Sequence, residues 1–68
     1  MKRAIGYFFV TDDALYYISV EEVQRGTTYR ARVYSVTAKR TVCDYVMRGR
    51  SAESVAKQLE NLIAGGEA

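Results

Sequence analysis

The connections between the β-type segments of this sequence are very short, and this feature limits the fold more than any other. Segments rich in Tyr, Val, Ile, Phe and Thr, which suit a pleated sheet, run from Arg3 to Thr11, Ala14 to Val23, Thr28 to Thr37 and Thr41 to Arg48. They are separated by Asp12-Asp13, by Arg25-Gly26 and by a less clear turn at 38–40. A crossover between parallel strands needs about a dozen residues or more, so consecutive strands must be antiparallel. The sequence therefore predicts a four-stranded meander.

The last segment of the chain has the pattern of an amphipathic helix. Ser51 can cap its amino end and Gly65 can end it. Its apolar residues recur at helical spacing, and they are Ala52, Val55, Ala56, Leu59, Leu62 and Ile63. Its polar side is predicted to consist of Glu53, Lys57, Gln58, Glu60 and Asn61, with Glu53 placed to pair with Lys57.

These patterns together predict an α+β fold. We expect a four-stranded antiparallel meander sheet followed by one C-terminal helix packed on one face, in the order ββββα. A chain of 68 residues has room for one domain. We place that domain at residues 1–64 and a flexible tail at residues 65–68.

Side-chain chemistry predicts the strand register, because a slip of one residue would exchange the two faces of a strand. Two-residue turns in the first two hairpins create one continuous apolar face, which we expect to lie under the helix. Its residues are Ile5, Tyr7 and Phe9, then Tyr16, Ile18 and Val20, then Ala31 and Val33. In the third hairpin, a three-residue loop turns Asp44 outward and avoids an unpaired buried carboxylate. That loop brings Cys43, Tyr45 and Met47 inward.

The same register leaves the opposite face of the sheet, here called the outer face, without cover. Phe8, Tyr17 and Tyr34 align across three strands of this face. The apolar residues around them are predicted to be Val10, Leu15, Val36, Val42 and Val46. Four strands span about 19 Å and a helix is about 10 Å across, so one helix cannot cover both faces. The aromatic row would exceed the roughly 300–600 Å² patch of a typical monomer, although sheets also carry scattered aromatics on wet faces.

We therefore predict a partner-binding site on the outer face. Its residues are Phe8, Tyr17, Arg30, Arg32 and Tyr34. A protein is the favoured partner, and a second copy of this chain, paired through the sheet face, is one form of it. The alternative is a nucleic acid, because aromatic rings interleaved with arginine resemble the stacking platforms of RNA-binding sheets. The net charge of +2 permits nucleic-acid contact without requiring it.

The residues that usually carry catalysis or metals are scarce. The chain has no histidine, which removes the usual general base and every Cys-His or Ser-His pair. Its single cysteine, Cys43, can form neither an internal disulfide nor a structural zinc site. The acidic pairs Asp12-Asp13 and Glu21-Glu22 do not converge. We expect no catalytic residue, no cofactor and no metal, and an enzyme is the least favoured class.

The chain is expected to be cytoplasmic. A lone thiol suits a reducing compartment. The apolar run after Met1-Lys2-Arg3 is short, ends at Asp12 and has no cleavage site of a signal peptide. No run approaches the roughly 20 apolar residues of a membrane span, so no membrane partner is expected.

Some patterns resemble known families. From Tyr29 to Leu59, two strands and a helix opening at Arg50-Ser51 resemble double-stranded RNA-binding domains and integrase arm-binding domains. The hairpin from Ala14 to Thr37, with Tyr29-Arg30-Ala31-Arg32-Val33, a fourth strand and a helix, resembles some small phage-encoded anti-CRISPR proteins. That resemblance covers about half the chain and includes no diagnostic motif. It implies a non-catalytic inhibitor that occupies a host nuclease complex.

Overall fold

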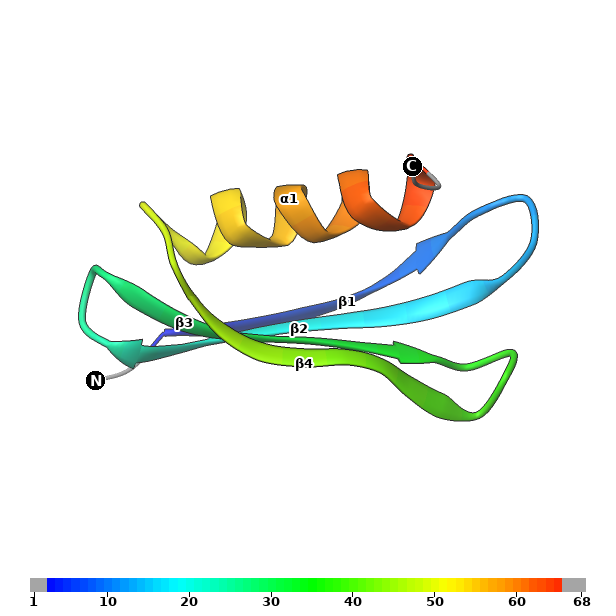
Figure 1. Cartoon of the computed structure of the whole chain (residues 1–68), viewed down its shortest axis with the longest axis horizontal. Coiled ribbons are helices and arrows are strands. Elements are labelled where there is room, and N and C mark those ends of the chain that lie inside the picture. Colours follow the sequence, from blue (N-terminus) through cyan, green and yellow to red (C-terminus); the bar gives the residue numbers. More distant parts are fainter. Residues whose placement is uncertain (1–2, 66–68) are drawn as a thin grey trace.

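The computed structural model describes residues 3–65, which form one sheet and one helix (Figure 1). The elements are β1 (Ala4–Val10), β2 (Leu15–Gln24), β3 (Thr28–Ser35), β4 (Arg40–Arg48) and α1 (Ala52–Ala64). The strands lie in the order β1-β2-β3-β4, and all neighbours are antiparallel. The predicted ββββα fold is confirmed. Of the predicted tail, all but Gly65 lies outside the described residues.

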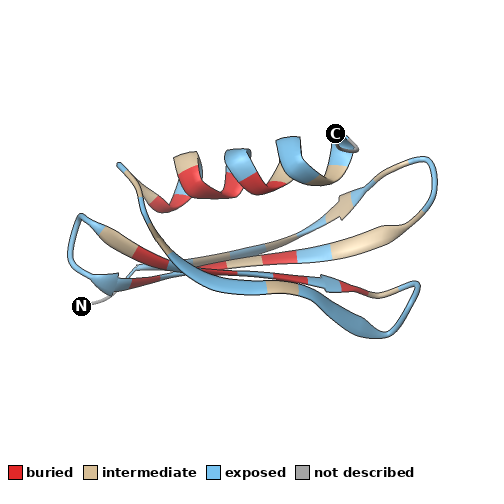
Figure 2. Ribbon diagram, in the orientation of Figure 1, coloured by how far each residue is buried: buried red, intermediate tan, exposed pale blue. Residues whose placement is uncertain are grey.

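The core lies between α1 and the inward face of β2 and β3. Alternation is strict in β3, where every second residue is buried from Tyr29 to Ser35. In Figure 2 the buried stretches of α1 face those of the sheet. The buried apolar residues are Ile18, Val20, Tyr29, Ala31, Val33, Ala52, Val55, Ala56 and Leu59. Each large side chain among them contributes about 1.5–3 kcal/mol through burial, so this cluster provides the main driving force for folding.

Both ends of α1 are defined by local contacts. Ser51 has extended backbone, and its hydroxyl accepts a hydrogen bond of 3.1 Å from the amide of Ser54. The helix ends where the amide of Gly65 donates to the carbonyl of Asn61 at 2.7 Å. A β-carbon on Gly49 would come within 2.4 Å of Val55, so glycine lets the β4–α1 connection pass close to the helix.

Two acidic side chains of α1 connect the helix to Arg3, just before β1, and to Tyr7 of β1. Glu53 pairs with Arg3 instead of Lys57, and Lys57 lies 3.9 Å from Glu60. The Tyr7 hydroxyl donates a hydrogen bond to Glu60. Burial raises the pKa of Tyr7, and the hydrogen bond to the Glu60 carboxylate raises it further. These contacts align one flank of the helix with β1.

The predicted register is confirmed for the first two hairpins. Tyr7 pairs with Ile18, and Ile18 pairs with Val33, which builds the inward apolar face. One irregularity that the sequence did not indicate lies in β2, where the register shifts between Glu22 and Gln24. The extra residue, Val23, forms a β-bulge just before the turn that contains Gly26 (φ 72°).

The third hairpin differs from the predicted three-residue loop. Ser35 pairs with Arg40, so the loop runs over residues 36–39, with Lys39 in the left-handed region (φ 59°). The register then shifts, because Tyr34 pairs with Thr41 while Val33 pairs with Cys43. The bulge places Val42 between these pairs and keeps Asp44 on the outer face, opposite Arg32.

The β4 side chains that were predicted to turn inward lie on the helix side, but they are not all covered. Cys43 and Met47 are half-buried and pack against the core, as predicted. Tyr45 lies opposite buried Ala31, yet it remains 39% exposed. The reason is that α1 packs against β1, β2 and β3 and does not reach over the edge strand β4.

Candidate functional site on the outer face

An aromatic row crosses three strands of the outer face, as the sequence predicted. Phe8 of β1 pairs with Tyr17 of β2, which pairs with Tyr34 of β3. The rings of Phe8 and Tyr17 meet edge to face, with centroids 5.0 Å apart and planes at 65°. Phe8 is 65% exposed, Tyr17 37% and Tyr34 41%. The described part of the chain therefore leaves these rings accessible to solvent.

Tyr17 lies over Gly6, the neighbour of Phe8 two residues earlier in β1. A β-carbon at Gly6 would come within 2.1 Å of the Tyr17 hydroxyl oxygen and 2.9 Å of its ring carbon Cζ. Glycine thus leaves the space that the hydroxyl end of the Tyr17 ring occupies. This role of Gly6 was not part of the sequence prediction, although a glycine inside a strand is a signal of close approach.

The apolar residues around the row are mostly where the sequence placed them. Val10 and Val46 are strongly exposed, while Leu15 and Val36 are half-buried. The prediction for Val42 is wrong. Val42 lines a hollow between β4 and α1 together with Leu59 and Leu62, because the bulge turns it to the helix side.

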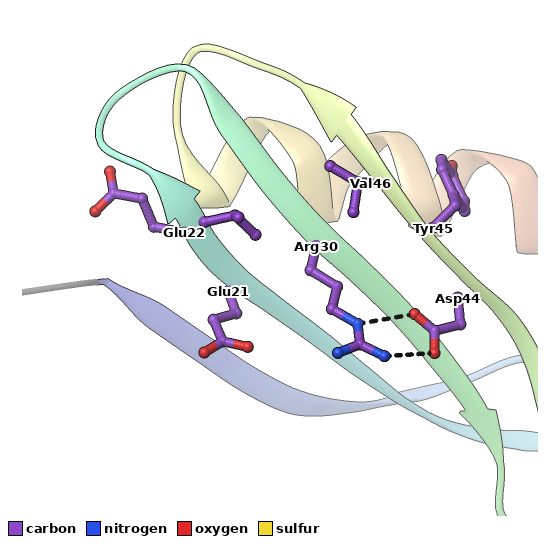
Figure 3. A pocket seen from close by; sticks show the side chains of 7 residues that line it. Glu21, Glu22, Arg30, Asp44, Tyr45 and Val46 are labelled. Carbon is purple, nitrogen blue, oxygen red and sulfur yellow. Dashed lines mark hydrogen bonds and ion pairs between the residues drawn. The ribbon is translucent and has the colours of Figure 1, made fainter.

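Arg30 does not extend freely into solvent. Its Nε and Nη2 atoms donate hydrogen bonds of 3.0 Å each to the two carboxylate oxygens of Asp44 (Figure 3). The hydrogen bonds from Arg30 hold the pKa of Asp44 below its ordinary value, and they raise the pKa of Arg30. The pair lies in a shallow hollow lined by Glu21, Glu22, Val23, Arg30, Asp44, Tyr45 and Val46.

Arg32 occupies a different position beside the aromatic row. It pairs across the sheet with Ser19 and Asp44, and it lines a second hollow with Tyr17, Tyr34 and Thr41. Among residues 3–65, Arg32 makes no ion pair within 4.0 Å. It is therefore the arginine of the predicted site that is free to contact a partner.

The charges on the outer face are more balanced than the two arginines alone indicate. Glu21 pairs across the sheet with Arg30, and Asp44 pairs with Arg32. The two carboxylates thus offset the guanidinium groups of Arg30 and Arg32, while exposed Arg48, opposite Thr28, adds one further cation to the face. The predicted site contains neither acidic residue; for Asp44 the reason is the incorrect β3–β4 register, which did not place it directly opposite Arg32.

A cysteine thiol and clusters of metal-binding side chains support catalysis or ligand binding in other proteins. Cys43 is half-buried, and burial raises the pKa of its thiol, which disfavours the reactive thiolate. In the span from residue 3 to residue 65, no cluster of three or more His, Cys, Asp or Glu side chains is positioned to hold a metal ion. The one helix of that span is too short and too polar to cross a membrane.

Comparisons with protein-family models, with curated proteins and with solved structures gave no match. The geometry of the outer face is therefore the basis for the function proposed below.

Proposed function

We propose that this chain is a small, non-catalytic binding protein that docks a protein partner through the outer face. The observation that supports it is the row of Phe8, Tyr17 and Tyr34, which stays 37–65% exposed beside Arg32 on the face that α1 does not cover. Tyr and Arg are enriched among binding hot spots, since each combines a large contact area with directional hydrogen bonds. Fixing the rings on adjacent strands also lowers the entropy lost on binding.

The charge pattern favours a protein over a nucleic acid. Phosphate binding relies on several cationic side chains that are free to replace counterions. Here Arg30 is already engaged by Asp44, and Glu21 adds a second carboxylate to the face. A nucleic acid remains the second candidate because the exposed ring of Phe8 could stack on a base.

The resemblance to small phage-encoded anti-CRISPR proteins supports a more specific partner class. In this form of the proposal, the partner is a protein component of a nuclease complex, and docking inhibits the complex by occupying its surface. An open sheet face suits that role, because it offers a broad contact area without any catalytic group.

The experiment is the capture of partners from a cell lysate by immobilised protein, with and without nuclease treatment. We expect a protein that is retained after nuclease treatment and is lost when Tyr34→Ala replaces the wild type. A matched control is Lys57→Ala, which changes an exposed residue of α1 on the other side of the molecule. Loss of all binding after nuclease treatment would favour the nucleic-acid candidate. Equal retention by Tyr34→Ala would show that the outer face is not the site.

A further inference from the structure

The edge strand β1 is unusually well suited to pairing with another strand. Its sequence, Ala-Ile-Gly-Tyr-Phe-Phe-Val, contains no charged residue and no proline, and its register with β2 runs without a shift. Natural sheets normally blunt their edges with charges, prolines or bulges, because an open edge pairs readily with other chains. The opposite edge follows this rule: β4 has a bulge and three charged residues, Arg40, Asp44 and Arg48.

The backbone of β1 presents its free hydrogen-bonding groups at alternate residues. The carbonyl of Arg3 accepts from the amide of Glu22, and the amide of Thr11 donates to the carbonyl of Ala14. In an antiparallel ladder, residues that bond to one neighbouring strand alternate with residues whose N–H and C=O point the other way. The odd-numbered residues of β1 therefore bond to β2. The outward-pointing groups belong to Ala4, Gly6, Phe8 and Val10.

We propose that two copies of this chain pair through β1, antiparallel, with a two-fold axis at Tyr7. In this register Gly6 lies opposite Phe8 of the second copy, and Ile5 lies opposite Phe9. Ala4 lies opposite Val10, so every residue of the strand has a partner. The residues whose backbone N–H and C=O groups point away from β2 fall opposite one another. Such a pair can form both of its hydrogen bonds. The result is one continuous eight-stranded sheet with both helices on the same side.

The side chains match in this register because the strand is nearly symmetric about Tyr7. A small residue lies opposite a larger apolar one on the outer face, and half-buried Ile5 meets half-buried Phe9 on the helix side. A shift by two residues in one direction would place Ala4 opposite Asp12. A shift in the other direction would leave Val10 without a partner in β1. Only the central register pairs the complete strand without a charge.

Both faces of the dimer remain consistent with the contacts inside each copy. On the helix side, the charged groups next to β1 are already paired, Arg3 with Glu53 and Lys57 with Glu60. On the outer face, Phe8 of the second copy arrives at Gly6, next to the ring of Tyr17 that lies there. The aromatic row would then continue from one copy into the other. The dimer would double the surface assigned to partner binding, but its formation does not depend on that function.

The test is sedimentation or light scattering of purified protein over a range of concentrations. It compares the wild type with variants that carry charged residues at positions 4 and 10. Both side chains are exposed on the outer face, and they lie at opposite ends of β1. In the proposed register, the double variant Ala4→Lys and Val10→Lys places two lysines opposite each other at both ends of the pairing. We expect this change to raise the dimer dissociation constant about tenfold. The matched variant, Ala4→Lys and Val10→Glu, places opposite charges together and should restore dimerisation.

Each outcome decides the proposal. Loss in the first variant with restoration in the second supports both the interface and its register. A wild-type protein that stays monomeric at high concentration would overturn it, and so would a dimer that is indifferent to both designs. Circular dichroism of each variant checks that the fold is intact. Tyr34→Ala, placed two strands away from the edge, should leave dimerisation unchanged, so failure of the dimer and failure of the binding site can be told apart.

Discussion

The hydroxyl end of Tyr17 lies over Gly6, at a place where a β-carbon would approach it to 2.1 Å. We predict that Gly6→Ala moves the Tyr17 ring and breaks its edge-to-face contact with Phe8. The change in the free energy of unfolding should stay below about 1 kcal/mol, because alanine is the better strand residue and offsets the lost contact. NMR chemical shifts of the Phe8 and Tyr17 rings would report the movement. Unchanged shifts would contradict it.

A core truncation in α1 should be far more damaging than a surface change two residues away. Leu59 is fully buried, and Leu59→Ala should cost about 2–5 kcal/mol of unfolding free energy through lost burial and a cavity. Lys57→Ala should be nearly silent, since the Lys57 side chain is 72% exposed and its 3.9 Å ion pair with Glu60 is weak. Chemical denaturation of both variants measures the difference. Similar midpoints would be inconsistent with the helix packing described above.

Binding and folding should separate on the outer face. Tyr34→Ala should weaken partner binding by about 2 kcal/mol or more, roughly thirtyfold in affinity. The cost to the fold should be under about 1 kcal/mol, because Tyr34 is 41% exposed. Titration calorimetry with the captured partner, together with a thermal melt, measures both quantities. A variant that loses stability and affinity equally would indicate a structural role for this ring.

Arg32→Ala distinguishes the two partner classes. With a nucleic-acid partner, the variant should reduce the slope of log affinity against log salt by about one unit, because one phosphate contact is lost. With a protein partner, the affinity should fall while the salt slope changes little. The matched control is Arg30→Ala, whose guanidinium is already bound to Asp44. An equal slope change for both arginines would mean that the Arg30–Asp44 pair opens on binding.

Glu22 should make the fold sensitive to acid. Its carboxylate is nearly buried and accepts hydrogen bonds from the amides of Gly26 at 2.8 Å and Arg3 at 3.2 Å. These bonds lower the pKa of Glu22 in the folded state. The carboxylate therefore stabilises the fold above the ordinary carboxyl pKa of 4.5, and this contribution is lost as the pH falls through the lowered value.

The variant Glu22→Gln removes that titration. Its thermal midpoint should fall less steeply than that of the wild type as the pH drops below 4.5. Glu21→Gln is the matched control, because Glu21 is exposed on the other face of the same strand. A wild-type profile retained in Glu22→Gln would assign the acid sensitivity to another group.

The sequence predicts the aromatic row because the first two hairpins have clear turns. Asp12-Asp13 and the turn at Gly26 set a register in which a slip of one residue would bury polar side chains, so Phe8, Tyr17 and Tyr34 align. The third hairpin lacks such a signal. Its left-handed residue is Lys39 rather than glycine, and nothing in the local pattern indicates the bulge at Val42.

The features that the sequence did not predict depend on the third hairpin and on the position of α1. The pairing of Arg30 with Asp44 depends on the β3–β4 register, which the bulge changes. The exposure of Tyr45 depends on how far the helix reaches across the sheet, which is set by tertiary packing and not by strand periodicity. Local sequence patterns indicate where α1 begins and ends, but they do not specify that it packs over β1 to β3.

That placement of α1 has a consequence for the order in which the molecule opens. β4 is joined to β3 by the backbone ladder, but none of its side chains is fully buried, whereas β3 is buried at every second residue. Strands held mainly by exposed hydrogen bonds open more often than strands anchored in a core. Amide hydrogens of β4 should therefore exchange with solvent ahead of those that join β2 and β3. Local opening would begin at the fourth strand while the rest of the sheet stays closed around the helix.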